Sequence, residues 1–185
     1  GKGIHPDDLS LALSRHATSK VSCFKDLESI RSLGFRGEAL ASIGAVSRLS
    51  LTSAMEGQSV GAVISSDPQQ PDIKPASHPT GTTVDIRDIF YNTPARRKFL
   101  RAPRTEFLHI QTIFHRLALS HFDVGFSLTH NQRPVFTSNP ALDDVAITDR
   151  VTQVMGREFI QEALQIEFEA AGIRLTGYIA LPVFS

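Results

Sequence analysis

Residues 31–40, RSLGFRGEAL, have a spacing that is suited to phosphate binding: two glycines three apart, followed at once by good helix formers. Backbone N–H groups at the start of a helix bind anions, and glycine lets a phosphate approach them closely. One helix ending at Gly34 and another starting at Gly37 would produce the same pattern. These ten residues alone leave the two interpretations open.

A second candidate is a basic stretch without any acidic residue. Its cations are Arg96, Arg97, Lys98, Arg101 and Arg104. Thr93 followed by Pro94 predicts a helix start, which would place Arg97 and Arg101 four apart on one face. Such a cluster can bind the phosphates of DNA, although a solvated basic helix face is the commoner explanation.

Composition argues against a disordered protein and against a membrane anchor. The chain of 185 residues is 41% hydrophobic and 21% charged with zero net charge, which is typical of a globular protein. Binding of a polyanion must therefore come from local clusters of positive charge.

The single cysteine, Cys23, has no activating partner nearby in sequence, and the histidines lack metal-ligand spacing, so we predict no zinc site. We expect a cytoplasmic protein, because no signal peptide or apolar run of ~20 residues is present.

The elements that must position these residues alternate in the first half of the chain. Helices are predicted from His5 to His16, over 26–33, and from Gly37 with Leu40 and Ile43 on the buried side. Strands with period-two alternation follow over 48–53, 58–66 and 80–89. The Pro-rich segment 67–80 is expected to form an exposed connection at the sheet edge.

The second half of the chain predicts a further set of elements. They are a long helix over 105–120, a hairpin over 122–138, a linker over 138–149, a short helix over 150–156 and two strands joined at Ala171 and Gly172. One hairpin and one helix cannot bury enough surface to stand alone. We therefore expect a truncated domain over 1–148, and the beginning of a second domain, cut short, over 149–185.

Four segments carry motifs at characteristic spacing. They are GKGIHPDDLSLALSRHATSK, LGFRGEALASIGAVSRLSLTS, HPTGTTVDIRDIFYNTPARRKFL and TEFLHIQTIFHRLALSHFDVGFSLTHN. Together they closely resemble the N-terminal ATPase region of the MutL family of DNA mismatch repair proteins. The resemblance implies an α+β fold, namely the two-layer helix-on-mixed-sheet ATPase fold of the gyrase B, histidine kinase and MutL group, followed by the start of a second α/β domain.

The resemblance also implies an ATP site. Gly1 and Gly3 match the glycines of a family motif, Asp-x-Gly-x-Gly, whose aspartate reads the adenine amino group. The strand motif beside the adenine is matched by Gly81, Thr82 and Thr83. The lid segment over the triphosphate is matched by Ala17, Thr18, Ser19 and Lys20. A flexible ammonium at Lys20 can reach a γ-phosphate.

The family's phosphate loop falls on the glycine segment. It is matched by Gly34, Phe35, Arg36, Gly37, Glu38, Ala39 and Leu40. We expect its backbone amides to remain open to phosphate. The side chain of Arg36 could pair with Glu38 or with a helix carboxylate, and we expect such a structural pairing rather than direct contact with phosphate.

The catalytic groups that the resemblance implies have no counterpart in these 185 residues. In the family a glutamate acts as general base and an asparagine holds Mg²⁺, both upstream of the aspartate motif, and a second-domain lysine reaches the γ-phosphate. We therefore predict no catalytic or metal-binding residue in this chain. The expectation is an ATPase that uses ATP and Mg²⁺ in the intact protein, and a chain that is inactive alone.

The partners implied by the resemblance are DNA, a mismatch recognition protein and a downstream repair nuclease or helicase. An ATP-dependent homodimer of the intact protein is also implied, in the bacterial cytoplasm and without a membrane. Two alternatives remain: the ATPase domain of a sister family, either a type II topoisomerase subunit or a chaperone, and a non-enzymatic DNA-binding module. The stretch NTPARRKFL favours mismatch repair over the sister families.

Overall fold

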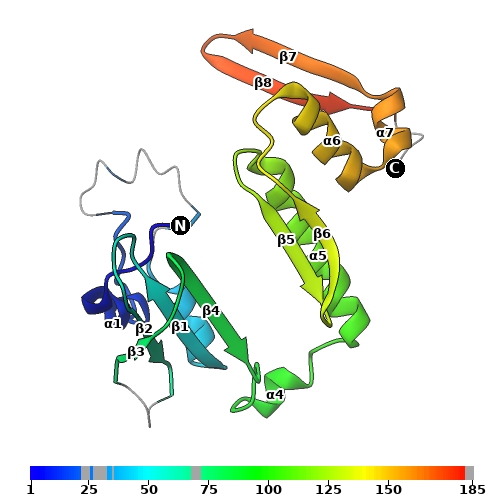
Figure 1. The fold of residues 1–185 in the computed structure, drawn as a ribbon. Helices are drawn as coiled ribbons and strands as arrows, with labels where there is room; N and C mark the ends of the chain where they lie inside the picture. The colour runs from blue at the N-terminus through cyan, green and yellow to red at the C-terminus, as the bar shows by residue number, and fades with distance from the viewer. Residues whose placement is uncertain (22–25, 27–32, 35, 68–71, 182–185) are drawn as a thin grey trace. The chain divides into compact units, whose positions relative to one another are not determined.

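The computed structural model describes residues 1–21, 26, 33–34, 36–67 and 72–181. It divides into two compact units, Gly1–Leu100 and Arg101–Ser185, and each is described by itself (Figure 1). The helix predicted over 26–33 rests on residues outside the described ones, as does Cys23.

An antiparallel sheet of four strands, in the order β3-β2-β1-β4, forms the frame of the first unit (Figure 1). The strands are β1 (Arg48–Ala54), β2 (Gly61–Ser65), β3 (Lys74–Ala76) and β4 (Gly81–Arg87). The three strands predicted from alternation are confirmed. β3 forms within the Pro-rich segment that we expected to be a connection, and it lies at the sheet edge, where Pro75 is tolerated.

Short helices accompany this sheet. They are the 3₁₀ turn η1 (Pro6–Asp8), α1 (Leu9–Ala12), α3 (Ala39–Gly44) and α4 (Pro94–Arg97). The chain bends into the 3₁₀ turn at His5, whose ring nitrogen accepts a hydrogen bond from the backbone N–H of Asp7.

The helix α4 is shorter than predicted. It starts at Pro94 as expected, but it ends at Arg97, and the Thr93 side chain makes no capping bond. Arg101 lies beyond its end, so the prediction that Arg97 and Arg101 share one helix face is wrong. Pro103, the first residue of the next helix, disfavours helical conformation only at Ala102, so it does not account for the earlier end of α4 at Arg97.

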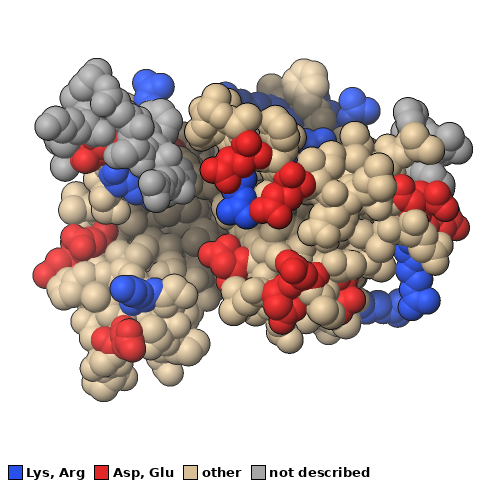
Figure 2. All heavy atoms as spheres, turned by 90° about the horizontal axis from the view of Figure 1, so that it is seen from above, with Lys and Arg blue, Asp and Glu red and all other residues tan. Residues whose placement is uncertain are grey.

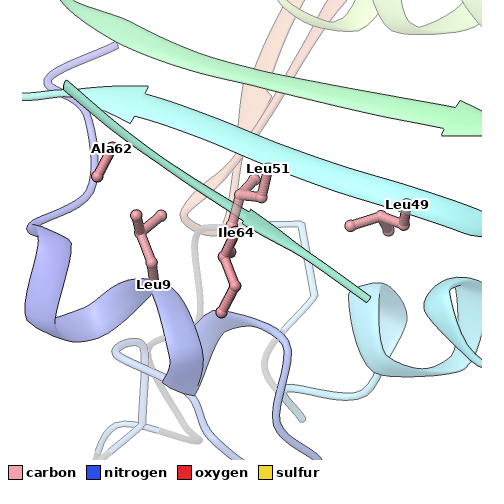
Figure 3. Close-up of a cluster of buried hydrophobic side chains, with 5 residues drawn as sticks. All are labelled: Leu9, Leu49, Leu51, Ala62 and Ile64. Atoms are coloured by element: carbon pink, nitrogen blue, oxygen red, sulfur yellow. The ribbon is translucent and has the colours of Figure 1, made fainter. Parts of the chain in front are cut away.

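The core of the first unit lies between the helices and one face of the sheet. Figure 3 shows its five buried side chains, which are Leu9, Leu49, Leu51, Ala62 and Ile64. Side chains of α1 and α3, including Ala12, Leu40 and Ile43, pack against this cluster. The cross-strand register, which pairs Leu51 with Ile64, puts the apolar positions of both strands on this face. The helix-on-sheet layering predicted from sequence is confirmed.

The second unit begins with a long helix and a hairpin. They are α5 (Pro103–Ser120), β5 (Phe126–His130) and β6 (Arg133–Ser138). Phe114 of α5 makes edge-on ring contacts with Phe126 and Phe136, each at 5.6 Å between centroids. These contacts explain the apolar spacing that predicted the helix.

The rest of the second unit is formed by two helices and a second hairpin. They are α6 (Asp144–Met155), α7 (Arg157–Glu162), β7 (Leu164–Ala170) and β8 (Ile173–Ile179). The predicted linker is wrong over 144–149, because the side chain of Asp143 caps α6 by accepting from the N–H of Ala146 at 2.8 Å. The expected domain boundary at 148/149 falls inside α6, and that domain assignment stays a prediction. None of the described helices is both long and apolar enough to cross a membrane.

Candidate functional site

The N-terminal glycines lie against the ends of two strands. Gly3 has φ of +80°, and a Cβ there would collide with the carbonyl oxygen of Ala54 at the end of β1. The nearest atom to a Cβ built at Gly81 is the carbonyl oxygen of Gly1, at 3.8 Å. The structure therefore brings the Gly-x-Gly turn to the start of β4, as the resemblance implies.

Ser53 joins these segments, and the sequence interpretation missed it. The backbone N–H of Ile4 donates to Ser53 Oγ at 2.7 Å. Ser53 Oγ also lies 2.9 Å from the carbonyl oxygen of Gly81 and 2.9 Å from Thr82 Oγ1. The alternation of β1 contained a signal, because Ser53 follows Leu49 and Leu51 on the buried face. A polar side chain there needs hydrogen-bond partners.

The two threonines of the strand motif point to opposite faces of β4. Thr82 pairs with Ser53 across the strands. Thr83 faces away, and its Oγ1 lies 2.7 Å from Nε2 of His78. Of the two predicted threonines, the structure brings Thr82 to the N-terminal turn and leaves Thr83 on the other side of the sheet.

The predicted lid segment and phosphate loop form a second cluster. The backbone N–H of His16 donates to the carbonyl oxygen of Gly37 at 3.1 Å. Gly37 has φ of +64°, and a Cβ there would collide with the backbone of Ala17. His16 itself has φ of +64°, which is uncommon for a residue with a side chain. No hydrogen bond between described residues joins this cluster to the one around Ser53.

The carboxylate of Glu38 lies near two basic side chains. Its Oε1 lies 3.1 Å from Nδ1 of His16 and 3.5 Å from Nε of Arg36. An unpaired carboxylate in a phosphate loop would repel a nucleotide, so these contacts reduce that conflict. Of the two partners left open for Arg36, Glu38 or a helix carboxylate, the structure places Glu38 beside it. The contact between His16 and Glu38 had no signal in the sequence beyond the place of His16 next to the lid segment.

Lys20 and the loop amides complete this cluster. Lys20 Nζ donates to the carbonyl oxygen of Leu33 at 2.6 Å, and its backbone N–H donates to Thr18 Oγ1 at 3.2 Å. Among the described residues, no acceptor faces the backbone N–H groups over 36–38. Phe35 lies outside the described residues, and Leu40 packs into the core rather than toward the loop.

The turn that carries the basic stretch is anchored to the first unit. The N–H of Phe90 donates to the carbonyl oxygen of Val46 at 2.6 Å, and the Asn92 side chain donates to that of Ala45 at 2.9 Å. Arg48 lies over the ring of Tyr91 at 5.0 Å. These contacts hold the chain just before α4.

The five cations of the basic stretch are exposed and form no ion pair within the described part of the chain. The nearby carboxylates are occupied: Asp88 lies 3.2 Å from Arg48 Nε, and Asp85 receives Nε and Nη2 of Arg87 at 2.6–3.1 Å. This hydrogen bonding lowers the pKa of Asp85 and raises the pKa of Arg87. Lys and Arg (blue) and Asp and Glu (red) both occur on the face shown in Figure 2.

Within the described ranges, no three His, Cys, Asp or Glu side chains are grouped so that they could hold a metal ion.

Comparison with known proteins gives no matching family model. The chain is 52% identical over 187 aligned positions to the DNA mismatch repair protein MutL of Pseudomonas entomophila (strain L48), with 100% of this chain and 30% of that protein covered. It is 53% identical to the protein of the same name from Azotobacter vinelandii, with 100% of this chain and 29% of that protein covered. The chain thus spans about 30% of the length of these relatives.

Two solved structures share the fold. The first is the Aquifex aeolicus MutL ATPase domain complexed with ADP, with a TM-score of 0.70 and 26% identity over 97% of this chain and 61% of that chain. The second is the ATPase domain from the bacterial mismatch repair endonuclease Aquifex aeolicus MutL, with a TM-score of 0.66 and 25% identity over 97% of this chain and 58% of that chain. The predicted α+β ATPase fold is confirmed by these matches, and similarity over its whole length shows that the chain belongs to the MutL family of DNA mismatch repair proteins.

Proposed function

We propose that these residues form the ATP-binding part of a MutL-like DNA mismatch repair protein, an ATP-driven switch or clamp that couples mismatch recognition to downstream repair. The observation that carries this proposal is the match over 97% of the chain to a MutL ATPase domain complexed with ADP. The alternatives, a sister ATPase family or a non-enzymatic DNA-binding module, lack a comparable match among these proteins.

The proposed nucleotide seat has two sides. Gly1, Gly3 and Thr82 lie on the adenine side, where the glycine turn meets β1 and β4. Thr83 remains a candidate there only through its backbone, because its hydroxyl faces His78.

The phosphate side is formed by the loop before α3 and by the lid segment. Its proposed members are Ala17, Thr18, Ser19, Lys20, Gly34, Phe35, Arg36, Gly37, Glu38, Ala39 and Leu40. The N–H groups over 36–38 have no acceptor among the described residues, which fits an anion, and Arg36 and His16 lie beside the carboxylate of Glu38. The Lys20 ammonium, now on the Leu33 carbonyl, is a point charge on a flexible stem that can turn to a γ-phosphate.

Mg²⁺ would accompany ATP in the intact protein and neutralise charge on its phosphates. No residue of this chain is proposed as its ligand.

Nucleotide binding by the full-length protein tests the proposal. We expect ADP and ATP to bind in calorimetry, and we expect Lys20→Ala to weaken ATP more than ADP, because only ATP has the γ-phosphate. Lys98→Ala, an exposed lysine of the basic stretch, is the control and should leave both affinities unchanged. Absence of ADP binding by the unmodified protein overturns the proposed function, whereas equal losses for ATP and ADP reject only the γ-phosphate role.

We further propose that the full-length protein hydrolyses ATP and that these 185 residues alone do not, because the family's general base and metal ligand match none of them. Phosphate release by the 185-residue chain should equal a buffer control. Release well above that control, surviving repurification, contradicts this prediction.

The proposed partners of the intact protein are DNA, a mismatch recognition protein and a downstream repair nuclease or helicase, with ATP-dependent homodimerisation in the bacterial cytoplasm. The basic stretch is the proposed DNA contact, since its cations are exposed and unpaired among the described residues. We also propose that residues from about 149 onward belong to a second domain.

A further inference from the structure

Ser53 is a buried hydroxyl in an apolar row. It has 1% of its surface exposed and follows Leu49 and Leu51 on the face of β1 that packs against the helices. A hydroxyl in such a position is unfavourable unless its hydrogen bonds are made. Ser53 therefore has to be explained by what it contacts.

Counting donors and acceptors gives one arrangement that satisfies all three contacts. A serine hydroxyl has one hydrogen and two lone pairs. The N–H of Ile4 uses one lone pair, and the carbonyl of Gly81 can only accept, so it takes the hydrogen. The hydroxyl of Thr82 must then donate to the second lone pair of Ser53. This assignment leaves the lone pairs of Thr82 Oγ1 available to a ligand donor.

The backbone of the glycine turn also approaches β1 closely beside Ser53. A Cβ at Gly3 would collide with the Ala54 carbonyl, next to Ser53 in the chain. The contacts join residues that are 49, 28 and 29 positions apart in sequence, so Ser53 links three separate segments through one atom. A shift of the turn or of β4 relative to β1 breaks its hydrogen bonds to Ser53.

We infer that Ser53 is a positioning residue of the nucleotide site: it fixes the Gly1–Ile4 turn and the Thr82 hydroxyl relative to each other on the adenine side. This inference rests on the proposed function, because it assigns a role within the same site. Ser53 acts through Ile4, Gly81 and Thr82 and does not itself touch the nucleotide.

Ser47 offers a matched control. It is a buried serine too, 2% exposed, just before β1, and its hydroxyl donates to the carbonyl oxygen of Ile43 at 2.7 Å. Ser47→Ala thus removes a buried hydroxyl and its hydrogen bond without touching the glycine turn or β4.

The experiment compares Ser53→Ala and Ser47→Ala in the full-length protein by calorimetry with ADP and GDP and by thermal unfolding. We expect Ser53→Ala to weaken ADP binding at least tenfold and to reduce the preference for ADP over GDP, because base recognition depends on the turn. Ser47→Ala should lower the melting temperature comparably and keep ADP affinity within twofold. Ser53→Thr, which restores the hydroxyl, should recover part of the ADP affinity.

An ADP affinity of Ser53→Ala within twofold of the unmodified protein overturns the inference, whatever happens to its stability. Equal losses of ADP affinity in both alanine variants also overturn it, because they indicate a general loss of structure. If Ser53→Ala does not fold, Ser53→Cys, which keeps the volume with weak hydrogen bonding, is judged by the same criteria. If the unmodified protein binds no ADP, the proposed function fails first and the inference with it.

Discussion

Arg150 is a fully buried cation without a carboxylate partner among the described residues. Only 1% of it is exposed, and its guanidinium donates to Ser138 Oγ and to the carbonyl oxygens of Ala118, His121, Val124 and Asn139. Two of these carbonyls lie at the end of α5, where the helix dipole favours a positive charge. All five N–H donors are therefore used, and the charge is compensated by carbonyl dipoles.

Replacing Arg150 should strongly destabilise the second unit. Arg150→Met keeps much of the volume but leaves several buried carbonyls without donors, so we expect a loss of about 3 kcal/mol in the free energy of unfolding. Urea unfolding of the protein measures this loss. Arg157→Met, at an exposed position of α7, is the control and should change stability by less than about 0.5 kcal/mol. Similar values for both variants would show that the hydrogen bonds of Arg150 contribute little.

Asp85 provides a prediction about pH. Its hydrogen bonds from Arg87 lower its pKa in the folded state, so this pair stabilises the fold above the ordinary carboxyl pKa of 3.8 and loses that contribution as the pH falls through the lower folded value. We expect Arg87→Met to return the pKa of Asp85 toward 3.8, as measured by an NMR titration. Arg174→Met, which breaks the exposed pair with Glu167, is the control and should leave the pKa of Asp85 unchanged. The same Asp85 pKa in the unmodified protein and in Arg87→Met would contradict the prediction.

At the scale of elements, the contact between the lid segment and the phosphate loop depends on a glycine. Gly34 and Gly37 both have positive φ, +70° and +64°, so alanine is unfavourable at either by roughly 1 kcal/mol. Only at Gly37 does a Cβ collide with the backbone of Ala17, whereas nothing lies within 4 Å of one at Gly34. Alanine at Gly34 therefore tests the cost of a positive φ alone, whereas alanine at Gly37 adds the collision with the backbone of Ala17.

We expect Gly37→Ala to destabilise the first unit clearly more than Gly34→Ala, because the 16–17 segment must also move. Thermal unfolding of both variants measures the difference. Hydrogen exchange at the N–H of His16, which donates to the Gly37 carbonyl, should speed up in Gly37→Ala alone. Equal effects at the two glycines would mean that the loop adapts to the extra methyl group.

Local sequence patterns predicted a helix or strand well where the pattern lies entirely within that one element. The alternation of β1 comes from one face that packs on the core, and the spacing of α5 includes Phe114, which contacts the hairpin, so period alone identifies both elements. The first turn of α6 was missed because the polar run before it was interpreted as a linker, although Asp143 is a good helix cap. Thr93 and Pro94 indicate where α4 starts but contain no signal for its end at Arg97.

The candidate site shows the limit of such predictions. Glycine spacing indicated the turn at Gly1–Gly3 and the loop at Gly34–Gly37, because backbone conformation is a local property. The contacts of Ser53 and the compensation of Glu38 by His16 join residues far apart in sequence. They depend on how the segments meet in three dimensions, and no local pattern contains that information.

At the scale of the whole molecule, the basic stretch crosses from one unit to the other. Arg96, Arg97 and Lys98 belong to the first unit, where the preceding turn is anchored to Ala45 and Val46. Arg101 and Arg104 belong to the second unit.

The DNA prediction therefore uses one cation from each unit. Each phosphate contact that is lost should lower the slope of log K against log salt by about 0.9 for duplex DNA. We expect Arg97→Ala and Arg101→Ala each to weaken binding and flatten the slope, and the double variant to show the sum of both changes, for any DNA sequence alike. Arg174→Ala in the full-length protein is the control, because Arg174 is exposed but paired with Glu167. Unchanged DNA affinity together with a clear fall in stability would reject the DNA contact and leave a structural role for these arginines. If only one arginine changes the slope, only that arginine contacts the DNA backbone.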